Sequence, residues 1–454
     1  MADIDDLATV TPETGPAEMG PQLHFIDGEF VPSRDGSTFT TLDPTTNAPL
    51  AEVADGKSAD IDAAVAAARR AFDDGPWPRL SAAERARVLR RIADTIRKPG
   101  GVTGMIMPWN APLMLSTWRI APALAAGNTI VLKPAEWSPL TATRMSELFQ
   151  EAGVPDGVFN MVHGFGETAG APLSSHPGVN LICFTGEPST GAIVMAAGAP
   201  TLKRHSLELG GKSPVVVFAD ADPDLAVDAT LAQIFTMNGQ RCTAGSRLLV
   251  ERPLHDRIVD AVAERAANIR VGDPFDERTE LGPLIHPEHH QRVLAYIEDA
   301  RRDGARIVAG GGRPDHLRAG NFLAATVIAD VSERMTVFAE EIFGPVLVAT
   351  PFDGEEEAIR LANATPYGLA AYVWTNDIKR AHRVAHAIDT GMCWINSQNV
   401  RDLRTPFGGV KASGIGREGG DYAFDFYCDV EVVHVALSSH AIPKLGTSPA
   451  DEEA

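Results

Sequence analysis

The chain has 454 residues, of which 44% are hydrophobic and 22% charged. This composition is ordinary for a globular enzyme, and the length predicts two or three domains. Its formal net charge of −20 repels phosphate backbones and anionic lipids, so neither nucleic acid nor a membrane is expected as a partner. The four scattered cysteines include no C-x-x-C pair, which predicts reduced thiols in a cytoplasmic protein.

The predicted elements alternate along the chain after residues 1–20, which are acidic, lack periodicity and are expected to form a disordered leader. A short hairpin is predicted at 24–31, followed by helices at 58–72 and 81–97. Helical stretches then separate short β-branched runs, and a second alternating series extends from about 222 to about 396. The predicted strands of the first series are 129–132, 158–162, 181–184 and 215–218, and a last strand is predicted at 431–436. Such alternation predicts parallel sheets in two tandem α/β domains.

Cys242 stands in the segment GQRCTAG (239–245), where small neighbours leave room for a substrate carbon to approach. A thiolate is a strong nucleophile, and a nearby cation or helix N-terminus would lower its pKa. The alternative interpretation is a buried structural cysteine.

Two further polar residues could serve chemistry. Glu208 precedes a Gly-Gly turn in LELGGKSP (207–214), so a flexible loop could deliver its carboxylate as a general base. Asn110 ends the segment PWN, and its amide is a neutral donor that can stabilise an oxyanion. Their alternatives are a solvated glutamate and a turn or helix-cap asparagine.

Glycines mark two candidate nucleotide-binding turns. Gly186 and Gly191 flank EPST directly after the predicted strand at 181–184, where backbone could approach a pyrophosphate at a helix N-terminus. The segment GFGETA (164–169) matches one form of the dinucleotide fingerprint, with Glu187 at about the ribose-binding spacing. A match this short can arise by chance in a chain with 41 glycines.

Longer motifs resemble those of the aldehyde dehydrogenase superfamily, in the family's order, over roughly residues 22–436. They are PWNAPL (108–113), KPAEWSP (133–139), FTGEPSTG (184–191), LELGGKSP (207–214), GQRCTAGSR (239–247), EEIFGPV (340–346) and PFGGVKASGIGREGG (406–420). The resemblance implies an α/β fold with a Rossmann-type cofactor domain, an α/β catalytic domain and a small oligomerisation arm. The implied bounds are 21–210 for the NAD-binding domain, 211–411 for the catalytic domain, 412–430 for a return to the cofactor domain, 431–437 for an oligomerisation strand and 438–454 for a tail.

The resemblance also implies an NAD(P)-dependent oxidation of an aldehyde to a carboxylic acid. Cys242 would attack the aldehyde carbon, with the Asn110 amide and the backbone N–H of Cys242 holding the oxyanion of the thiohemiacetal. Transfer of hydride to the nicotinamide would leave a thioester, which a water activated by Glu208 would hydrolyse. Glu418 matches a second family glutamate that supports proton relay, with a solvated surface position as its alternative.

For the cofactor, Lys133 and Glu136 match the pair that contacts the adenosine ribose. A carboxylate there favours NAD over NADP, although NADP stays open. The resemblance implies no metal. The remaining implied positions are Gly166 near the adenine, Gly186 and Gly191 under the pyrophosphate, Glu341 and Phe343 at the nicotinamide ribose and ring, Trp109 beside the cofactor path, and Trp118 in the substrate channel.

The commonest family pattern has serine at the position of Glu187. A glutamate at this position resembles one branch of the family, the 2-hydroxymuconic semialdehyde dehydrogenases and their 5-carboxymethyl form, which are enzymes of aromatic catabolism. The segment NSQNVRDLRTPFGG (396–409) resembles that branch as well. Arg401 and Arg404 are therefore candidates for gripping a substrate carboxylate, because a guanidinium fits a carboxylate with two hydrogen bonds. A structural salt bridge is the alternative.

One departure from the family is large, because the predicted helix at 81–97 runs directly into KPGGV (98–102). Family members carry several dozen more residues here, so the join resembles an internal deletion. A homodimer or homotetramer is expected but stays open. Three interpretations remain: an oxidising enzyme, a cysteine-dependent acyl transferase or esterase, and an inactive or partner-binding remnant. Glu208 favours hydrolysis, since the acylating branch typically lacks it.

Overall fold

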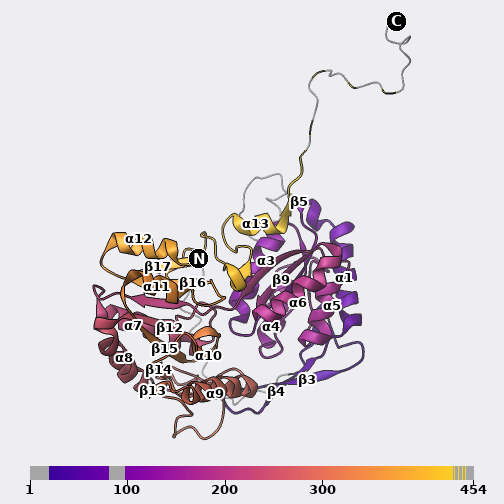
Figure 1. Ribbon diagram of the computed structural model, residues 1–454. Helices are drawn as coiled ribbons and strands as arrows, with labels where there is room; N and C mark the ends of the chain where they lie inside the picture. The colour runs from indigo at the N-terminus through magenta and orange to yellow at the C-terminus, as the bar shows by residue number, and fades with distance from the viewer. Residues whose placement is uncertain are drawn as a thin grey trace, which may run out of the picture.

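The computed structural model describes residues 20–80 and 98–432, together with His434, Ser438, Ile442 and Leu445. Nearly all of the predicted leader, the predicted helix at 81–97 and most of the predicted tail lie outside these residues. The described chain forms two large sheets, one in each half of the molecule in Figure 1, and helices cover both faces of each.

Eight strands form the first sheet. They are β1 (His24–Ile26), β2 (Glu29–Val31), β6 (Val102–Ile106), β7 (Thr129–Lys133), β8 (Phe159–Met161), β9 (Leu181–Gly186), β10 (Arg204–Leu209) and β18 (Gly414–Ile415). Their order is β18-β10-β9-β6-β7-β8-β1-β2, and the five strands from β10 to β8 are parallel. The chain order runs outward from β6 in both directions. The sheet therefore has a switch point between β6 and β9, where open α/β sheets bind ligands.

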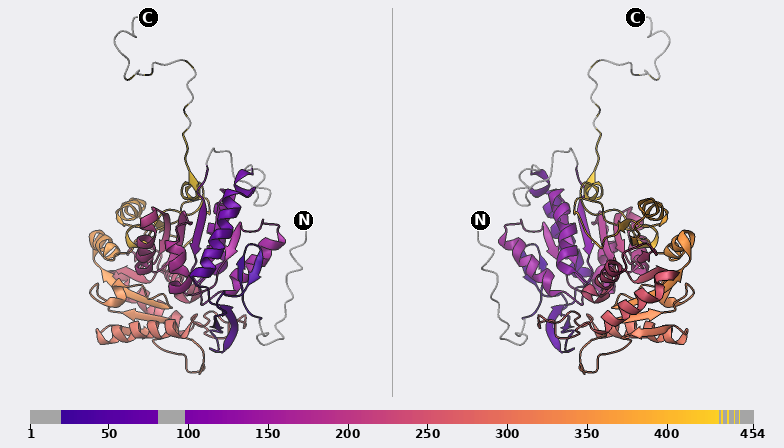
Figure 2. Two further views of the ribbon diagram at one scale, coloured as in Figure 1. Left: turned by 90° about the vertical axis from the view of Figure 1, so that its right-hand side faces the viewer. Right: turned by 90° about the vertical axis from the view of Figure 1, so that its left-hand side faces the viewer.

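Helices cover this sheet in two groups (Figures 1 and 2). One face carries α1 (Ser58–Asp73), α5 (Ala171–Ser175) and α6 (Pro188–Gly198); the other carries α3 (Pro112–Ala125), α4 (Leu140–Glu151) and α13 (Tyr422–Tyr427). Helix α1 shows why: Ile61, Val65 and Ala68 recur at helical spacing and are fully buried against the sheet.

The second sheet has seven strands, all parallel except β13 at one edge. In sheet order they are β13 (Arg306–Ala309), β14 (Thr326–Ala329), β15 (Val346–Phe352), β12 (Arg247–Glu251), β11 (Pro214–Val217), β16 (Ala370–Trp374) and β17 (Met392–Ile395). One face packs against α7 (Pro223–Phe235) and α8 (Arg252–Ala267), and the other against α9 (Pro287–Arg302), α10 (Thr336–Ala339), α11 (Gly354–Asn363) and α12 (Ile378–Ala387). The chain passes from the first sheet to the second between Leu209 and Pro214.

The early elements confirm the predicted pattern. The hairpin at 24–31, the helix at 58–72 and the strands at 129–132, 158–162, 181–184 and 215–218 all form, with ends within two residues of the prediction. A further hairpin joins β3 (Thr38–Leu42) to β4 (Pro49–Ala54). No helix of the described residues is long and apolar enough to cross a bilayer.

Glu431 and Val432, from the predicted last strand at 431–436, form no strand within this chain, and the predicted pairing of this strand with a neighbouring subunit stays a prediction. A short strand, β19 (Cys428–Asp429), lies earlier and pairs antiparallel with β5 (Lys98–Pro99). Tyr427, directly before β19, is fully buried with its hydroxyl 3.2 Å from Cys183 Sγ. Beyond it Val432 is 69% exposed. Most of 433–436 lies outside the described residues.

Candidate active site

Three predicted catalytic residues come together where the two sheets meet. Asn110 lies in the loop after β6, Glu208 lies in β10, and Cys242 follows the turn η5 (Thr236–Gly239). Asn110 Nδ2 donates a 2.9 Å hydrogen bond to the carbonyl of Gln240, two residues before Cys242. Glu208 is close enough to Cys242 to disfavour ionisation of its thiol. An amide donor, a carboxylate and a thiol thus share one site.

The loop that carries Cys242 is tightly packed. A Cβ atom on Gly211 would lie 2.4 Å from the carbonyl oxygen of Cys242, so the close approach of these loops requires glycine. Burial, then the carboxylates of Glu341 and Glu208, raise the pKa of Cys242 to about 12 against the lowering effect of Arg241. The expected lowering of the thiol pKa is therefore not built into the free protein, and the thiol is protonated at neutral pH.

Glu208 is 6% exposed, and neither of its carboxylate oxygens has a hydrogen-bond partner among the described residues. Burial raises its pKa well above the ordinary value; Arg119 opposes this, and Glu418 adds to it. Gly408, in the C-terminal part of the chain, packs against this carboxylate, because a Cβ at Gly408 would lie only 2.8 Å from Glu208 Oε1. A buried carboxylate with free acceptor positions is suited to take a proton from a water molecule.

Glu418 belongs to a buried ion pair that the sequence did not predict. Arg119 Nη1 lies 3.2 Å from Glu418 Oε1, and the two side chains are 3% and 5% exposed. Ser206 Oγ donates a 2.8 Å hydrogen bond to the same oxygen. Arg119 follows Trp118 on α3, and nothing in its local sequence distinguishes it from a surface arginine. The solvated alternative for Glu418 does not hold.

The candidate cofactor residues lie at the carboxyl edge of the first sheet. Lys133 Nζ, at the end of β7, is 2.9 Å from Glu136 Oε2. Gly166 begins the π-helical turn η3 (Gly166–Gly170), and no atom lies within 4 Å of the position of an added Cβ. Gly186 ends β9, and Gly191 lies in α6, where a Cβ would be 2.8 Å from Leu209. An ammonium, a carboxylate and an open helix start are groups that suit ribose hydroxyls and a pyrophosphate.

The second sheet contributes Glu341 and Phe343 from the loop after α10. Glu341 Oε1 accepts a 2.8 Å hydrogen bond from the N–H of Gly211. Phe343 has a φ of 59°, a strained conformation for this residue, and its carbonyl is 2.7 Å from His289 Nε2. Trp109 packs edge-on against Phe343, with ring centroids 5.2 Å apart. The loop that carries Glu341 and Phe343 is thus packed against Trp109, on the first sheet's side, and hydrogen-bonded to Gly211.

Helix α9 supplies neighbours of this cleft that the sequence did not predict. The ring of His286 stacks on Trp137 at 4.6 Å with an interplanar angle of 8°, and His289 lies 5.1 Å from Trp109. Arg292 forms an ion pair with Glu187 across the cleft. The only available signal was the histidine-rich segment HPEHH (286–290), which matches no motif.

The two candidate substrate arginines occupy different environments. The guanidinium carbon of Arg401 lies 4.3 Å from the ring centroids of both Trp118 and Phe407, and it has no hydrogen bond or ion pair with any described residue. Burial lowers the pKa of Arg401, while Cys242 and Glu208 are among the groups that raise it. Arg404 instead binds Asp402 through two nitrogens and is 88% exposed. The structure brings Arg401, and not Arg404, to the site.

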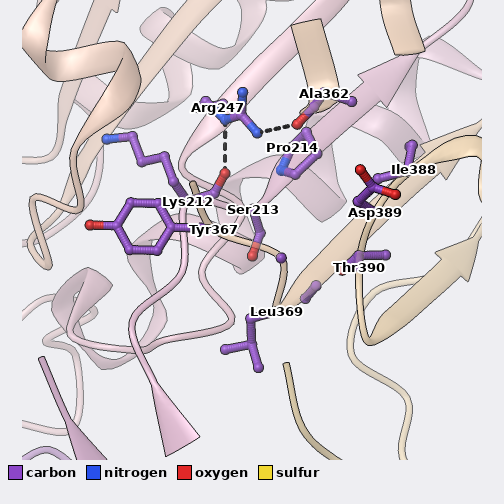
Figure 3. Close-up of a pocket in the computed structure, with 12 residues that line it drawn as sticks. Lys212, Ser213, Pro214, Arg247, Ala362, Tyr367, Leu369, Ile388, Asp389 and Thr390 are labelled. Carbon is purple, nitrogen blue, oxygen red and sulfur yellow. Dashed lines mark hydrogen bonds between the residues drawn. The ribbon is translucent and has the colours of Figure 1, made fainter. Parts of the chain in front are cut away.

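Two small hollows adjoin the loop between the sheets. One, of about 210 Å³, is lined by Lys212, Ser213, Arg247, Tyr367 and Asp389 among others (Figure 3). The other, of about 220 Å³, includes Gly211, Glu341 and Phe343 in its lining. Cys242 lines neither of them.

Comparison with known proteins gives matches over most of the chain. The sequence profile described as "Aldehyde dehydrogenase family" matches residues 30–98 and 93–433. A 2-hydroxymuconic semialdehyde dehydrogenase of Pseudomonas sp. (strain CF600) is 41% identical over 482 aligned positions, covering 91% of this chain and 99% of the relative. This alignment is longer than the 454-residue chain, so the relative has residues with no counterpart here.

Solved structures agree. The crystal structure of HpcC from Thermus thermophilus has a TM-score of 0.91 and 50% identity, covering 94% of this chain and 95% of that one. A Bacillus cereus aldehyde dehydrogenase, solved as its NAD+ complex, has a TM-score of 0.89 and 40% identity, with coverages of 92% and 97%. These matches confirm the predicted fold class and the predicted family and branch.

Proposed function

Since the chain belongs to the aldehyde dehydrogenase family, we propose that it oxidises a carboxylated semialdehyde to a carboxylic acid, with NAD as the oxidant. The observation that carries the proposal is the convergence of Cys242, Asn110 and Glu208. A thiol nucleophile, an amide donor tied to its loop, and a buried carboxylate with free acceptor positions are the groups that acyl chemistry through a thioester requires.

The donor set fits NAD. The Lys133–Glu136 pair can hold ribose hydroxyls, the start of α6 beside Gly186 can hold a pyrophosphate, and Glu341 with Phe343 can hold the nicotinamide ribose and ring. A carboxylate at Glu136 repels a 2′-phosphate and so favours NAD over NADP. When bound, NAD supplies the acceptor for a hydride. The Bacillus cereus relative with NAD+ supports this assignment.

The remaining steps belong to the chain's own residues. Glu208 in its ionised form takes the proton of the Cys242 thiol and releases it through Glu418, and the sulfur forms a bond to the aldehyde carbon as the carbon–oxygen double bond becomes single; the Asn110 amide and the Cys242 N–H hold the oxygen that gains the electron pair. After oxidation to the thioester, Glu208 takes a proton from water, the water oxygen bonds to the acyl carbon, and the thiolate of Cys242 leaves. We propose that Glu418, which is held by Arg119 and Ser206, receives the proton from Glu208.

Arg401 specifies the substrate class in this proposal. Its guanidinium lies against both Trp118 and Phe407, has no carboxylate partner among the described residues, and interacts electrostatically with both Cys242 and Glu208. A semialdehyde with a carboxylate at its far end could therefore bind Arg401 while its aldehyde meets Cys242. The hydrolytic outcome is favoured over acyl transfer because Glu208 lies in the site.

We also infer that a family segment is missing near residue 98. The two profile matches meet at residues 93–98, and the alignment with the Pseudomonas relative needs more positions than the chain has. The oligomer is proposed to be a homodimer or homotetramer. Size-exclusion chromatography with light scattering would decide between these, and a monomer would contradict both. A soluble protein without NAD binding in calorimetry would favour a remnant that has lost the activity.

The activity is tested by mixing the protein with NAD and a panel of aldehydes and following reduced nicotinamide. Turnover should be seen with wild type and lost in Cys242→Ser. Arg401→Ala should raise the KM for a carboxylated semialdehyde far more than for a neutral aldehyde. Arg404→Ala is the matched control, because Arg404 is exposed and bound to Asp402. No turnover in folded protein would defeat the proposal, and equal losses on both aldehydes in Arg401→Ala would defeat the assignment of Arg401.

A further inference from the structure

The turn that leads into Cys242 has a backbone conformation that its residues do not favour by themselves. Met237 and Asn238 have φ angles of 55° and 56°, in the left-handed region that residues other than glycine rarely adopt. Gln240, at the end of η5, has φ −80° and ψ 52°, outside both the helical and the strand regions. Such a turn persists only where other contacts hold it, so these contacts determine where the nucleophile lies.

Gln240 is held on two sides at once. Its side-chain Oε1 accepts a 3.0 Å hydrogen bond from the N–H of Ile285, and its backbone carbonyl accepts the 2.9 Å hydrogen bond from Asn110 Nδ2. The side-chain bond fixes the residue and therefore the direction of its carbonyl. An amide nitrogen carries two hydrogens. When the carbonyl of Gln240 takes one of those of Asn110, the other is left for an oxygen atom of a ligand.

The segment that binds the Gln240 side chain is itself well anchored. Leu284, next to Ile285, is 1% exposed and packs in the core of the second sheet. Its N–H donates a 3.0 Å hydrogen bond to the carbonyl of Asn321. The N–H of Ile285 is therefore a fixed point, and Gln240 connects this point to the oxyanion donor.

Asn238 attaches the same turn to the same segment without touching Asn110. Its Nδ2 donates to the carbonyl of Pro283 at 2.8 Å, and its Oδ1 accepts from the N–H of Gly282 at 3.1 Å. Both ends of this amide are thus used in holding the turn. Asn238 allows attachment of the turn to be distinguished from orientation of the Asn110 amide.

We propose that Gln240 is a positioning residue that aims the Asn110 amide at the oxyanion. The inference rests on the proposed role of Asn110 in the thiol chemistry of Cys242. The Ile285 N–H holds the Gln240 side chain, and the Gln240 carbonyl holds the Asn110 amide. A donor that is aimed before the substrate arrives stabilises the developing negative charge without having to reorient.

Two reactions of Cys242 separate this role from general support of the turn. In acylation by p-nitrophenyl acetate the sulfur bonds to the acyl carbon, the carbonyl oxygen takes the electron pair, and p-nitrophenolate leaves as the double bond forms again. Alkylation by iodoacetamide displaces iodide from a saturated carbon and forms no oxyanion. Loss of the Gln240 amide should therefore slow only acylation, whereas damage to the turn would slow both reactions because both use the same sulfur.

The experiment measures both rate constants without cofactor, from the burst of p-nitrophenolate and from the loss of free thiol, at the pH plateau of each variant. Gln240→Met keeps the length of the side chain but removes the acceptor for Ile285. It should slow acylation about tenfold, because a small misplacement of a reacting group costs up to about 100-fold. The alkylation rate and the half-saturating ester concentration should not change, since the oxyanion forms only after binding. Gln240→Glu keeps an acceptor and should retain most of the acylation rate.

Two comparisons locate the effect. In Asn110→Ala, adding Gln240→Met should slow acylation no further, because the group through which Gln240 acts is absent. Asn238→Gly is the matched control: it permits the positive φ and removes two attachments of the turn, so any change should be equal in the two reactions.

The inference would be overturned by an unchanged acylation rate in Gln240→Met, by equal slowing of the two reactions in this variant, or by its failure to fold. Further slowing when Gln240→Met is added to Asn110→Ala would also overturn it. A wild-type Cys242 that neither the ester nor iodoacetamide modifies would instead defeat the proposed function.

Discussion

Replacing Arg119 with methionine tests the electrostatic coupling behind the catalytic carboxylate. The Arg119 and Glu418 side chains are almost fully buried, and their closest polar atoms lie 3.2 Å apart. Removing the guanidinium leaves Glu418 buried with one hydrogen bond from Ser206 and without its positive partner. Breaking a buried ion pair in this way costs about 3–5 kcal/mol of stability. A lower melting temperature is therefore expected.

The same substitution should change how Glu208 titrates. Burial raises the pKa of Glu208 well above its ordinary value, and Arg119 is the strongest of the charges that lower it. Without Arg119 the pKa of Glu208 rises further. Because Glu208 acts as a base only when ionised, thioester hydrolysis should slow at neutral pH and recover as the pH is raised. Glu418→Gln should shift the profile the opposite way, since Glu418 raises the pKa of Glu208.

Stopped-flow measurement of NADH formation separates the steps. Arg119→Met should slow both the first turnover and the steady-state turnover at pH 7, with the acid limb of kcat displaced to higher pH. The double variant Arg119→Met/Glu418→Gln removes both charges of the pair and should regain stability relative to Arg119→Met. Wild-type melting together with an unshifted pH profile in Arg119→Met would refute the coupling, as would shifts of the same sign in the two single variants.

Three further outcomes are expected. Burial lowers the pKa of His24 to about 4 and of His163 to about 3, so both are neutral when folded, whereas the unfolded chain protonates them below about pH 6.5. Stability should thus be complete above pH 6.5 and fall toward pH 4, by about 3 kcal/mol for His24, and His163→Gln should flatten the melting profile. Asn110→Ala should slow the first turnover about 100-fold with NADH affinity unchanged, and an unaltered rate would exclude Asn110 as the oxyanion donor. Glu136→Ser should free Lys133 and improve NADP binding relative to NAD at least about tenfold in fluorescence titrations; an unchanged ratio would remove Glu136 from cofactor selection.

The sequence was sufficient to predict an element where the local pattern of residues alone determines the structure. Short β-branched runs such as 129–132 became buried parallel strands, because a strand covered on both faces needs apolar residues throughout. It failed at the C-terminal strand. It did not predict β19 at Cys428–Asp429, which directly follows the fully buried Tyr427. A buried tyrosine anchor depends on distant residues such as Cys183, which no local pattern reports.

The same difference between local pattern and distant contacts separates the site residues that the sequence predicted from those that it missed. Arg401 and Arg404 are equivalent in sequence, but only Arg401 meets the rings of Trp118 and Phe407, which come from other parts of the chain. Arg119 and Lys212 were missed because their segments resemble an ordinary helix surface and an ordinary loop. Tertiary packing removes both charges from water and sets Arg119 beside Glu418.

These buried charges share one arrangement. Arg119 acts on Glu208 and Lys212 acts on Glu341, so each acid near the nucleophile has a cation that favours its ionised form. Both carboxylates in turn oppose ionisation of Cys242, whose pKa burial has already raised. The free protein therefore disfavours the charged forms of Glu208, Glu341 and Cys242 alike, because burial outweighs the nearby cations at each group. A thiol kept protonated in this way resists alkylation and oxidation, which act on thiolates.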